Sequence, residues 1–252
     1  MTWVVDIGNS SIKWAECADG EVGKSHSFYR TAQGVAEDLD SIWGNDPSPE
    51  ELICSCVAGQ EFEQALEQWC HLVWGIKPVF IRSTAQANGV RNAYQQCDRL
   101  GSDRWAALVA AHQLISGPSC VISCGTAMTI DVLEADGQHM GGLIIPGRRL
   151  MTDSLSSGTK VSIEGSEGDN TTLFARNTAD AINGGVLYSI VATLDRVYHD
   201  VDQALGASVH RVITGGDADD ILPLLSGKIA HYPDLVLQGL AILGATREEE
   251  PS

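Results

Sequence analysis

The chain has 252 residues, of which 44% are hydrophobic, so it is long enough to bury the core of one large domain or of two smaller ones. Its formal net charge of −17 disfavours nucleic acid and anionic membranes as partners, because the summed field repels phosphate polymers. No apolar run reaches membrane-spanning length and Asp6 interrupts the apolar start, so we expect neither a transmembrane helix nor a signal peptide, and a cytoplasmic protein.

The first half of the chain predicts three short strands followed by alternating helices and strands. Short consecutive strands pair as antiparallel hairpins, and they are expected at 3–7, 11–17 and 27–29. The elements expected next are a helix at 32–43, a strand at 52–57, a helix at 60–74, a strand at 79–81 and a helix at 103–114. Gly117 and Pro118 end the last of these helices and mark a domain boundary.

The second half repeats this plan. Strands are expected at 120–124, 128–134, 140–145 and 209–214, and helices at 178–204, 217–226 and 234–247. We therefore expect two domains, formed by residues 1–117 and 118–252.

The opening phrase of the chain recurs about halfway along. Residues 4–14 read V-V-D-I-G-N-S-S-I-K-W and residues 121–131 read V-I-S-C-G-T-A-M-T-I-D, with Gly8 in register with Gly125. Each phrase takes an apolar strand into a glycine with small polar neighbours. One such phrase is more often an ordinary turn, but duplication of a half-domain favours a functional loop in each copy.

The chemistry of these two loops is suited to phosphate. Backbone N–H groups and hydroxyls around Gly8 can face an anion, and Asp6 at the strand end can hold a magnesium ion. Lys13 adds a positive point charge. The second copy offers Gly125, Thr126, Ala127 and Thr129 in the same roles.

Cysteine, histidine and tryptophan carry no separate site signal. The seven cysteines form no C-x-x-C pair and the seven histidines have no ligand spacing, so we expect free, buried thiols and neither a structural zinc nor a catalytic histidine. Five tryptophans lie beside apolar neighbours and are expected in the core or at an interface: Trp14, Trp43, Trp69, Trp74 and Trp105.

The order of elements resembles the ribonuclease-H-like plan of actin and the sugar kinases, an α/β fold with duplicated mixed sheets flanked by helices. The motifs sharpen this likeness over nearly the full length, and they resemble those of type III pantothenate kinases. They are D-I-G-N-S-S-I-K at 6–13, R-N-A-Y at 91–94, G-S-D-R at 101–104, C-G-T-A-M-T-I-D at 124–131, G-G-L-I-I-P-G at 141–147 and T-G-G at 214–216.

The resemblance implies ATP-dependent phosphorylation of pantothenate, the first step of coenzyme A biosynthesis, by a homodimer. It places ATP against Asp6, Ile7, Gly8, Asn9, Ser10, Ser11, Ile12 and Lys13, against Thr126, and against Gly215 and Gly216 near the adenosine, with magnesium on Asp6. It places pantothenate against Tyr94, Gly101, Ser102, Asp103, Arg104 and Thr178. The first domain would hold the first loop, the pantothenate pocket and the catalytic Asp103, and the second domain the second loop and the adenosine motif.

Asp103 and Arg104 suit the reaction that the family performs. Phosphoryl transfer needs a carboxylate to accept the proton of the attacking hydroxyl, which is the role implied for Asp103 as general base, and Arg104 can pair with the substrate carboxylate. The alternative is an ordinary carboxylate at a helix start and an arginine in a surface ion pair. Arg148 and Arg149 are expected in an exposed loop and are left out of the site.

One departure from the family pattern concerns a monovalent cation. Ser123 stands where relatives usually have an Asp that is associated with binding potassium or ammonium. A neutral hydroxyl attracts a cation less than a carboxylate does, so we expect weak or absent potassium dependence.

Three alternatives remain open at this point. The segment A-D-G-E-V-G-K-S at 18–25 satisfies a relaxed P-loop pattern, but no helical pattern follows it, so we expect a hairpin turn there. A regulatory or binding protein could keep the fold and lose catalysis, although Asp6, Lys13, Asp103 and Arg104 are all present. A phosphatase or a sugar kinase could also use this fold.

Overall fold

The computed structural model describes residues 1–158, 173–206 and 208–247. By contacts the chain divides into two compact units, and each is described by itself. The first unit comprises Met1–Gly117, Leu133–Gly141 and the segment from Asp234 onward, and the second comprises Pro118–Val132 and Gly142–Pro233. The division of the chain into domains after residue 117 stays a prediction, because compactness of contacts does not by itself define a domain.

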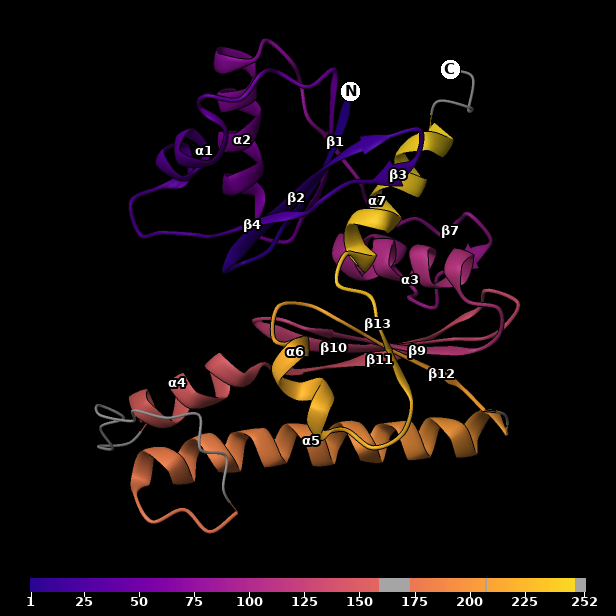
Figure 1. Ribbon diagram of the computed structural model, residues 1–252. Helices are drawn as coiled ribbons and strands as arrows, with labels where there is room; N and C mark the ends of the chain where they lie inside the picture. The colour runs from indigo at the N-terminus through magenta and orange to yellow at the C-terminus, as the bar shows by residue number, and fades with distance from the viewer. Residues whose placement is uncertain (159–172, 207, 248–252) are drawn as a thin grey trace. The chain divides into compact units, whose positions relative to one another are not determined.

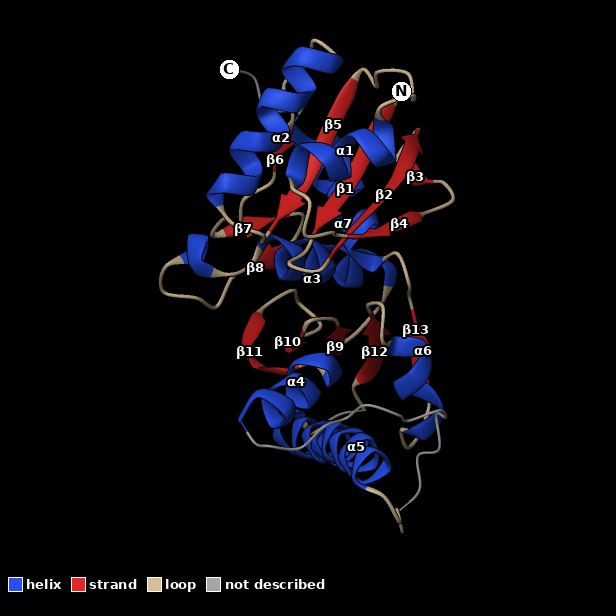
Figure 2. Cartoon of the chain, turned by 90° about the vertical axis from the view of Figure 1, so that its left-hand side faces the viewer, coloured by secondary structure: helices blue, strands red, loops and turns tan. Residues whose placement is uncertain are grey.

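The first unit is built on a mixed sheet with strand order β3-β2-β1-β5-β6, in which β4 also pairs with β2. Figure 2 shows β5, β1 and β2 side by side in this sheet. Its strands are β1 (Thr2–Ile7), β2 (Ser11–Ala18), β3 (Glu21–Val22), β4 (His26–Tyr29), β5 (Glu51–Cys56) and β6 (Val79–Phe80), and β7 (Gln86–Ala87) with β8 (Val90–Arg91) forms a separate ribbon. Its helices are α1 (Val35–Trp43), α2 (Gln60–Val73), a short 3₁₀ helix (Cys97–Arg99), α3 (Ser102–Leu114) and α7 (Leu235–Arg247).

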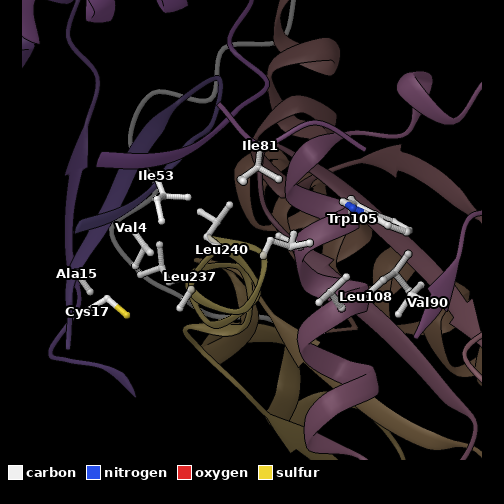
Figure 3. Packing of buried hydrophobic residues seen from close by; sticks show 14 of the residues in the cluster. Val4, Ala15, Cys17, Ile53, Ile81, Val90, Trp105, Leu108, Leu237 and Leu240 are labelled. Atoms are coloured by element: carbon white, nitrogen blue, oxygen red, sulfur yellow. The ribbon is translucent and has the colours of Figure 1, made fainter. Parts of the chain in front are cut away.

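Alternation along β1 divides the first unit into two cores. Trp3, Val5 and Ile7 pack with α1 and α2, whereas Val4 packs with α3 and α7 on the opposite face of the sheet. Figure 3 shows Val4, Ala15 and Ile53 of the strands directed toward Leu237 and Leu240 of α7, with Trp105 on α3 beyond them. Both faces are therefore buried, which explains why these strands are almost continuously apolar.

The second unit repeats the strand order of the first. Its five-stranded sheet runs β11-β10-β9-β12-β13, which matches the path β3-β2-β1-β5-β6 of the first sheet when β4, the additional strand paired with β2, is set aside. Its strands are β9 (Ser119–Cys124), β10 (Ala127–Leu133), β11 (His139–Pro146), β12 (His210–Thr214) and β13 (Ile229–His231), with the end of β10 and the start of β11 counted in the first unit. Its helices are α4 (Arg148–Gly158), α5 (Thr178–Leu205), α6 (Ala218–Ile221) and a 3₁₀ turn (Leu222–Leu224).

Helix α5 covers one face of the second sheet (Figure 1). Ile190, Leu194 and Tyr198 of this helix are buried against strand residues such as Ile122 and Ile130. No described helix is both long and apolar enough to cross a membrane.

The duplication predicted from the opening phrase is confirmed, because Gly8 and Gly125 each follow directly on the first strand of their sheet. The hairpin interpretation of residues 18–25 is also confirmed, since β2 turns back into the antiparallel strand β3 and the next element is the strand β4 and not a helix. All seven cysteines are free, and only Cys97 is not buried. Of the five tryptophans, Trp43, Trp69 and Trp105 are buried, and Trp14 and Trp74 pack on the α1–α2 core.

Some expectations about elements were wrong. Arg148 and Arg149 start α4 rather than lying in a loop, and this helix is hard to read from a sequence that is rich in Ser and Thr. The helix expected at 217–226 is instead the single turn α6 and a 3₁₀ turn containing Pro223, which lacks an N–H to continue an α-helix. The three-residue strand β13 was not predicted, because so short a strand has no measurable alternation.

Candidate active site

The pairing of β1 with its neighbours places three polar side chains on one face of the first sheet. Asp6 lies opposite Lys13 in antiparallel β2 and opposite Ser55 in parallel β5, and paired residues project to the same face. This is the face on which Val4 packs with α3 and α7. The strands β1 and β5 are parallel, and Asp6 and Ser55 are each the next-to-last residue of their strand. The site therefore lies at the carboxyl ends of these strands, where α/β sheets commonly bind ligands.

The turn after β1 is closed by backbone hydrogen bonding. The Gly8 amide donates to the Ser11 carbonyl at 2.9 Å, so residues 8–11 form a tight connection between β1 and β2. A Cβ atom on Gly8 would lie 3.3 Å from the same carbonyl oxygen, which is closer than side chains normally tolerate. Gly8 therefore permits the turn in which the first loop was predicted.

Helix α3 begins at the residues of the predicted pantothenate pocket. The Asp103 carboxylate accepts a hydrogen bond from the Arg104 amide at 2.8 Å, so it is folded back onto the first turn of the helix. A Cβ atom on Gly101 would lie 2.5 Å from Asp103 Oδ1. Glycine at 101 thus leaves the space that this carboxylate occupies, which is a physical reason for the spacing G-S-D-R.

A chain of buried hydroxyls links the start of α3 to Asp6. Ser55 Oγ lies 3.0 Å from Ser102 Oγ, and Ser55 is paired with Asp6 in the register of β5 and β1. Either of these two hydroxyls can be the donor of the hydrogen bond between them. The Ser102 hydroxyl, which the sequence placed in the pantothenate pocket, is therefore directed into this buried chain.

The Asp6 carboxyl group has a strongly perturbed pKa. Burial and the nearby negative charge of Asp103 raise the pKa to about 7, against the opposing effects of Ser55 and Lys13. Its Oδ1 atom is buried and has no hydrogen-bond partner. A buried carboxylate oxygen left in this state, with a second carboxylate nearby, fits a divalent cation.

The donor set fits magnesium better than a metal held by the protein alone. Among the residues that the structure describes, no group of three or more His, Cys, Asp or Glu side chains could hold a metal. Magnesium is typically bound by one or two carboxylates, with phosphate oxygens and waters completing an octahedron. Asp6 supplies such a carboxylate next to the first loop.

Lys13 is held in place by an acidic residue. Its Nζ lies 2.9 Å from Asp234 Oδ1, at the point where the chain enters α7. The two side chains are 30% and 27% exposed, so solvent weakens the attraction without removing it. The ion pair orients the lysine on the same face as Asp6.

Arg104 is buried, so the part of the alternative that placed it at the surface was wrong. Only 6% of Arg104 is exposed, and its Nη1 donates to the Tyr94 hydroxyl at 2.9 Å. The Tyr94 ring stacks on buried His139 with 6.2 Å between centroids and 15° between planes, and His139 Nδ1 accepts from the Ala93 amide at 3.4 Å. Arg104 and Tyr94, both predicted for substrate, are thus brought together.

The second loop lies beside the T-G-G motif within its own unit. Thr214 of β12 lies opposite Ser123 of β9, and the Asp217 amide donates to the Cys124 carbonyl at 3.1 Å. Gly215 has φ +94°, and a Cβ atom there would overlap the backbone of Cys124. The T-G-G motif therefore requires glycine in order to pass close to the end of β9.

The last residue of the G-G-L-I-I-P-G motif, Gly147, contacts the second loop. The Gly147 amide donates to the Thr126 carbonyl at 3.0 Å, and a Cβ atom on Gly147 would overlap the Gly125 carbonyl oxygen. Arg148 follows at the start of α4 and pairs with Asp220 at 3.1 Å.

The predicted site residues thus fall into two groups. The first unit brings together Asp6 to Lys13, Tyr94 and residues 101–104, whereas Thr126, Gly215 and Gly216 lie in the second unit. Thr178 is also in the second unit, exposed at the first position of α5, after the N-cap Asn177. Ser55 and His139 were missed; a lone Ser in the apolar run L-I-C-S-C-V was a signal for Ser55, and none pointed to His139.

Comparisons with known proteins agree with the motifs. The family model described as type III pantothenate kinase matches residues 2–200. A type III pantothenate kinase from Nitrosococcus oceani is 43% identical over 246 residues, which cover 96% of this chain and 92% of the relative.

Solved structures share the fold at low sequence identity. A Campylobacter jejuni protein described as a Baf family transcriptional activator has a TM-score of 0.60 at 19% identity, covering 98% of this chain and 100% of that one. A Sinorhizobium meliloti protein described as a 2-dehydro-3-deoxygalactonokinase has a TM-score of 0.59 at 14% identity, covering 100% and 98%. The fold is thus of the actin and sugar-kinase type, and the chain belongs to the type III pantothenate kinase family.

Proposed function

We propose that this protein transfers the γ-phosphoryl group of ATP to the hydroxyl of pantothenate, giving ADP and 4'-phosphopantothenate, the first step of coenzyme A biosynthesis. Family membership supports this reaction. The observation that carries it is the placement of Asp103 at the start of α3, close enough to Asp6 for its charge to raise the pKa of Asp6. Asp6 thus lies beside the proposed phosphate loop, and the nearby Asp103 is the carboxylate that would accept the proton.

In the proposed reaction the pantothenate hydroxyl oxygen forms a bond to the γ-phosphorus while the bond to the β-phosphate oxygen breaks. The hydroxyl proton passes to Asp103, which is the general base. The hydrogen bond from the Arg104 amide holds the Asp103 carboxylate against the first turn of α3 before the reaction begins. Arg104 Nη1 and the Tyr94 hydroxyl are the groups proposed to bind the pantothenate carboxylate and backbone.

ATP is proposed to lie against both loops. Asp6, Ile7, Gly8, Asn9, Ser10, Ser11, Ile12 and Lys13 make up the first loop with its flanking strand ends, Thr126 lies in the second loop, and Gly215 and Gly216 would lie near the adenosine. A magnesium ion bound to Asp6 would neutralise charge on the phosphates during transfer. Lys13, oriented by Asp234, adds a positive charge at the same place.

The remaining substrate contacts are proposed from the family likeness. Gly101 and Ser102 would line the pantothenate pocket by their backbone, because the Ser102 hydroxyl is directed to Ser55. Thr178 would join the pocket from the start of α5. A protein that uses ATP and a small acid is proposed to act in the cytoplasm.

A homodimer is proposed from an apolar surface on the second unit. A groove of about 800 Å³ lies along the first half of α5, and beside it Leu173, Phe174 and Tyr188 are 72%, 81% and 66% exposed. Large exposed apolar patches of this kind are typical of protein interfaces. A second copy of the chain is the occupant that we propose.

The Asp103→Asn variant tests the proposed role most simply. An amide keeps the shape but cannot accept the proton, so turnover should fall by about a hundredfold or more while ATP binding is unchanged. The measurement is ADP formation in the presence of pantothenate, together with ATP affinity by calorimetry. Near-normal turnover in the folded variant would remove Asp103 from the mechanism.

A further inference from the structure

We propose that Arg30 is a positioning residue that sets the orientation of the first phosphate loop. Arg30 directly follows β4 in the first unit, and the sequence motifs did not single it out. The inference rests on the proposed function, since it takes the turn at residues 8–11 to be the loop that holds the phosphates of ATP.

Arg30 contacts three successive carbonyl groups of the loop. Its Nη1 donates to the Gly8 carbonyl at 3.3 Å and to the Asn9 carbonyl at 3.0 Å. Its backbone amide donates to the Ser10 carbonyl at 3.0 Å. Arg30 thus donates hydrogen bonds to the carbonyl oxygens of Gly8, Asn9 and Ser10.

The geometry of the peptide bond turns this contact into an orientation of the amides. In a trans peptide the N–H points opposite to the C=O of the preceding residue, and no cis peptide occurs among the described residues. Because the Gly8 and Asn9 carbonyls both meet Arg30 Nη1, the amides of Asn9 and Ser10 point away from the guanidinium. The Ser11 amide likewise points away from the Arg30 backbone N–H. Successive amides turned to one side form a concavity that binds anions.

The Arg30 guanidinium packs on a buried aromatic ring. Its Cζ lies 4.5 Å from the centroid of the Phe62 ring, and Phe62 is a buried residue of α2. The next residue is also anchored, because the Thr31 amide and hydroxyl donate to buried Asp38 at 3.1 and 2.6 Å. A cation stacked on an aromatic ring loses little freedom when it donates, so the contact can order the loop before the nucleotide arrives.

Arg30→Met tests the proposal, and Arg82→Met is its matched control. Methionine keeps an apolar contact with Phe62 but cannot donate to the two carbonyls. Arg82 also lies over an aromatic ring, 5.5 Å from the centroid of Phe80, and pairs with Glu63 at 2.7 Å, but no described contact joins it to the loop. The two variants therefore share the loss of charge and of cation–π contact. Arg82→Met also removes the ion pair with Glu63, and only Arg30→Met removes hydrogen bonds to the loop.

The readout is the Kd of Mg·ATP by calorimetry, with the melting temperature and the steady-state constants of each variant. We expect Arg30→Met to weaken ATP binding about tenfold or more, the range for losing a charge-assisted hydrogen bond, and Arg82→Met to leave it unchanged. The KM for ATP should rise while the KM for pantothenate stays the same. Arg30→Lys keeps the charge without the planar fork and should recover only part of the loss.

Equal ATP affinity in the two methionine variants would overturn the inference. If Arg30→Met does not fold, Arg30→Lys decides, and parent-like ATP affinity in that folded variant would overturn the inference. Failure of the parent protein itself to bind ATP is a different outcome, since it would contradict the proposed function and not the role of Arg30 alone.

Discussion

At the scale of single residues, Asp6 is a strongly perturbed carboxyl group of the first unit. Its Oδ1 atom is buried without a hydrogen-bond partner, and burial together with Asp103 raises its pKa to about 7. A protein does not gain stability from such an arrangement at neutral pH, so the carboxyl is better explained by ligand binding than by folding.

The pH dependence of stability tests this perturbation in metal-free protein. A carboxyl whose pKa is higher in the folded state contributes stability below its unfolded pKa, near 4, and loses that contribution as the pH rises to about 7. The melting temperature of the parent, measured in EDTA, should therefore fall relative to that of Asp6→Asn by several degrees over this window. Parallel profiles for the two proteins would count against a raised pKa.

Ser123 carries a prediction about monovalent cations. It lies in β9 opposite Thr214, at the strand end that precedes the second loop. A hydroxyl attracts potassium less than a carboxylate does, so the parent should show little activation by potassium or ammonium over sodium, and Ser123→Asp should show more. Activity in the three salts is the measurement, and strong potassium activation of the parent, equal to that of the variant, would contradict the prediction.

The contrast between Asp6 and its neighbours shows what the sequence could predict about the site. Asp6, Gly8 and Asp103 lie in local phrases whose residue types suggest their chemistry. Ser55 and Arg30 reach the loop only through strand pairing and the path after β4, which no local pattern records. Such long-range contacts could be identified only from the structure.

At the scale of elements, α3 and α7 of the first unit pack closely against each other. A Cβ atom on Gly239 of α7 would overlap the backbone of Ala106 in α3, whereas on Gly244 it would meet only the Cδ1 end of the Ile53 side chain. The backbone of Ala106 cannot move aside as easily as the end of the Ile53 side chain can. The sequence predicted both helices, but a glycine within an apolar helix does not reveal which neighbour it approaches.

Alanine substitutions at the two glycines separate these effects. Gly239→Ala should reduce the free energy of unfolding by about 1–3 kcal/mol through overpacking. Gly244→Ala should cost less, because Ile53 can shift and alanine favours a helix by about 1 kcal/mol over glycine. Urea denaturation measures both, and equal or reversed losses would show that the close approach at Gly239 is not tight.

At the scale of the whole molecule, the two sheets share one strand order apart from the additional strand β4, and each places a glycine directly after its first strand. This duplication could be predicted from the sequence because both phrases keep the same spacing. The short strand β13 and helix α4 could not, since three residues carry no alternation and a Ser-rich segment has weak helix propensity.

The apolar surface of α5 leads to a prediction about assembly. The chain has a mass of 26.9 kDa, so light scattering at micromolar concentration should report about twice that value. Tyr188→Glu, which places a charge beside the groove, should shift the protein toward the monomer. A monomeric parent at this concentration would defeat the proposal of a homodimer.

The most direct measurement is product formation by the unmodified protein. Purified protein is incubated with Mg·ATP, with and without pantothenate, while ADP is followed by a coupled assay and the acceptor by mass spectrometry. The account predicts ADP formation that depends on pantothenate, together with 4'-phosphopantothenate in equal amount. ADP formation that is unchanged by pantothenate, with no phosphorylated product, would contradict it.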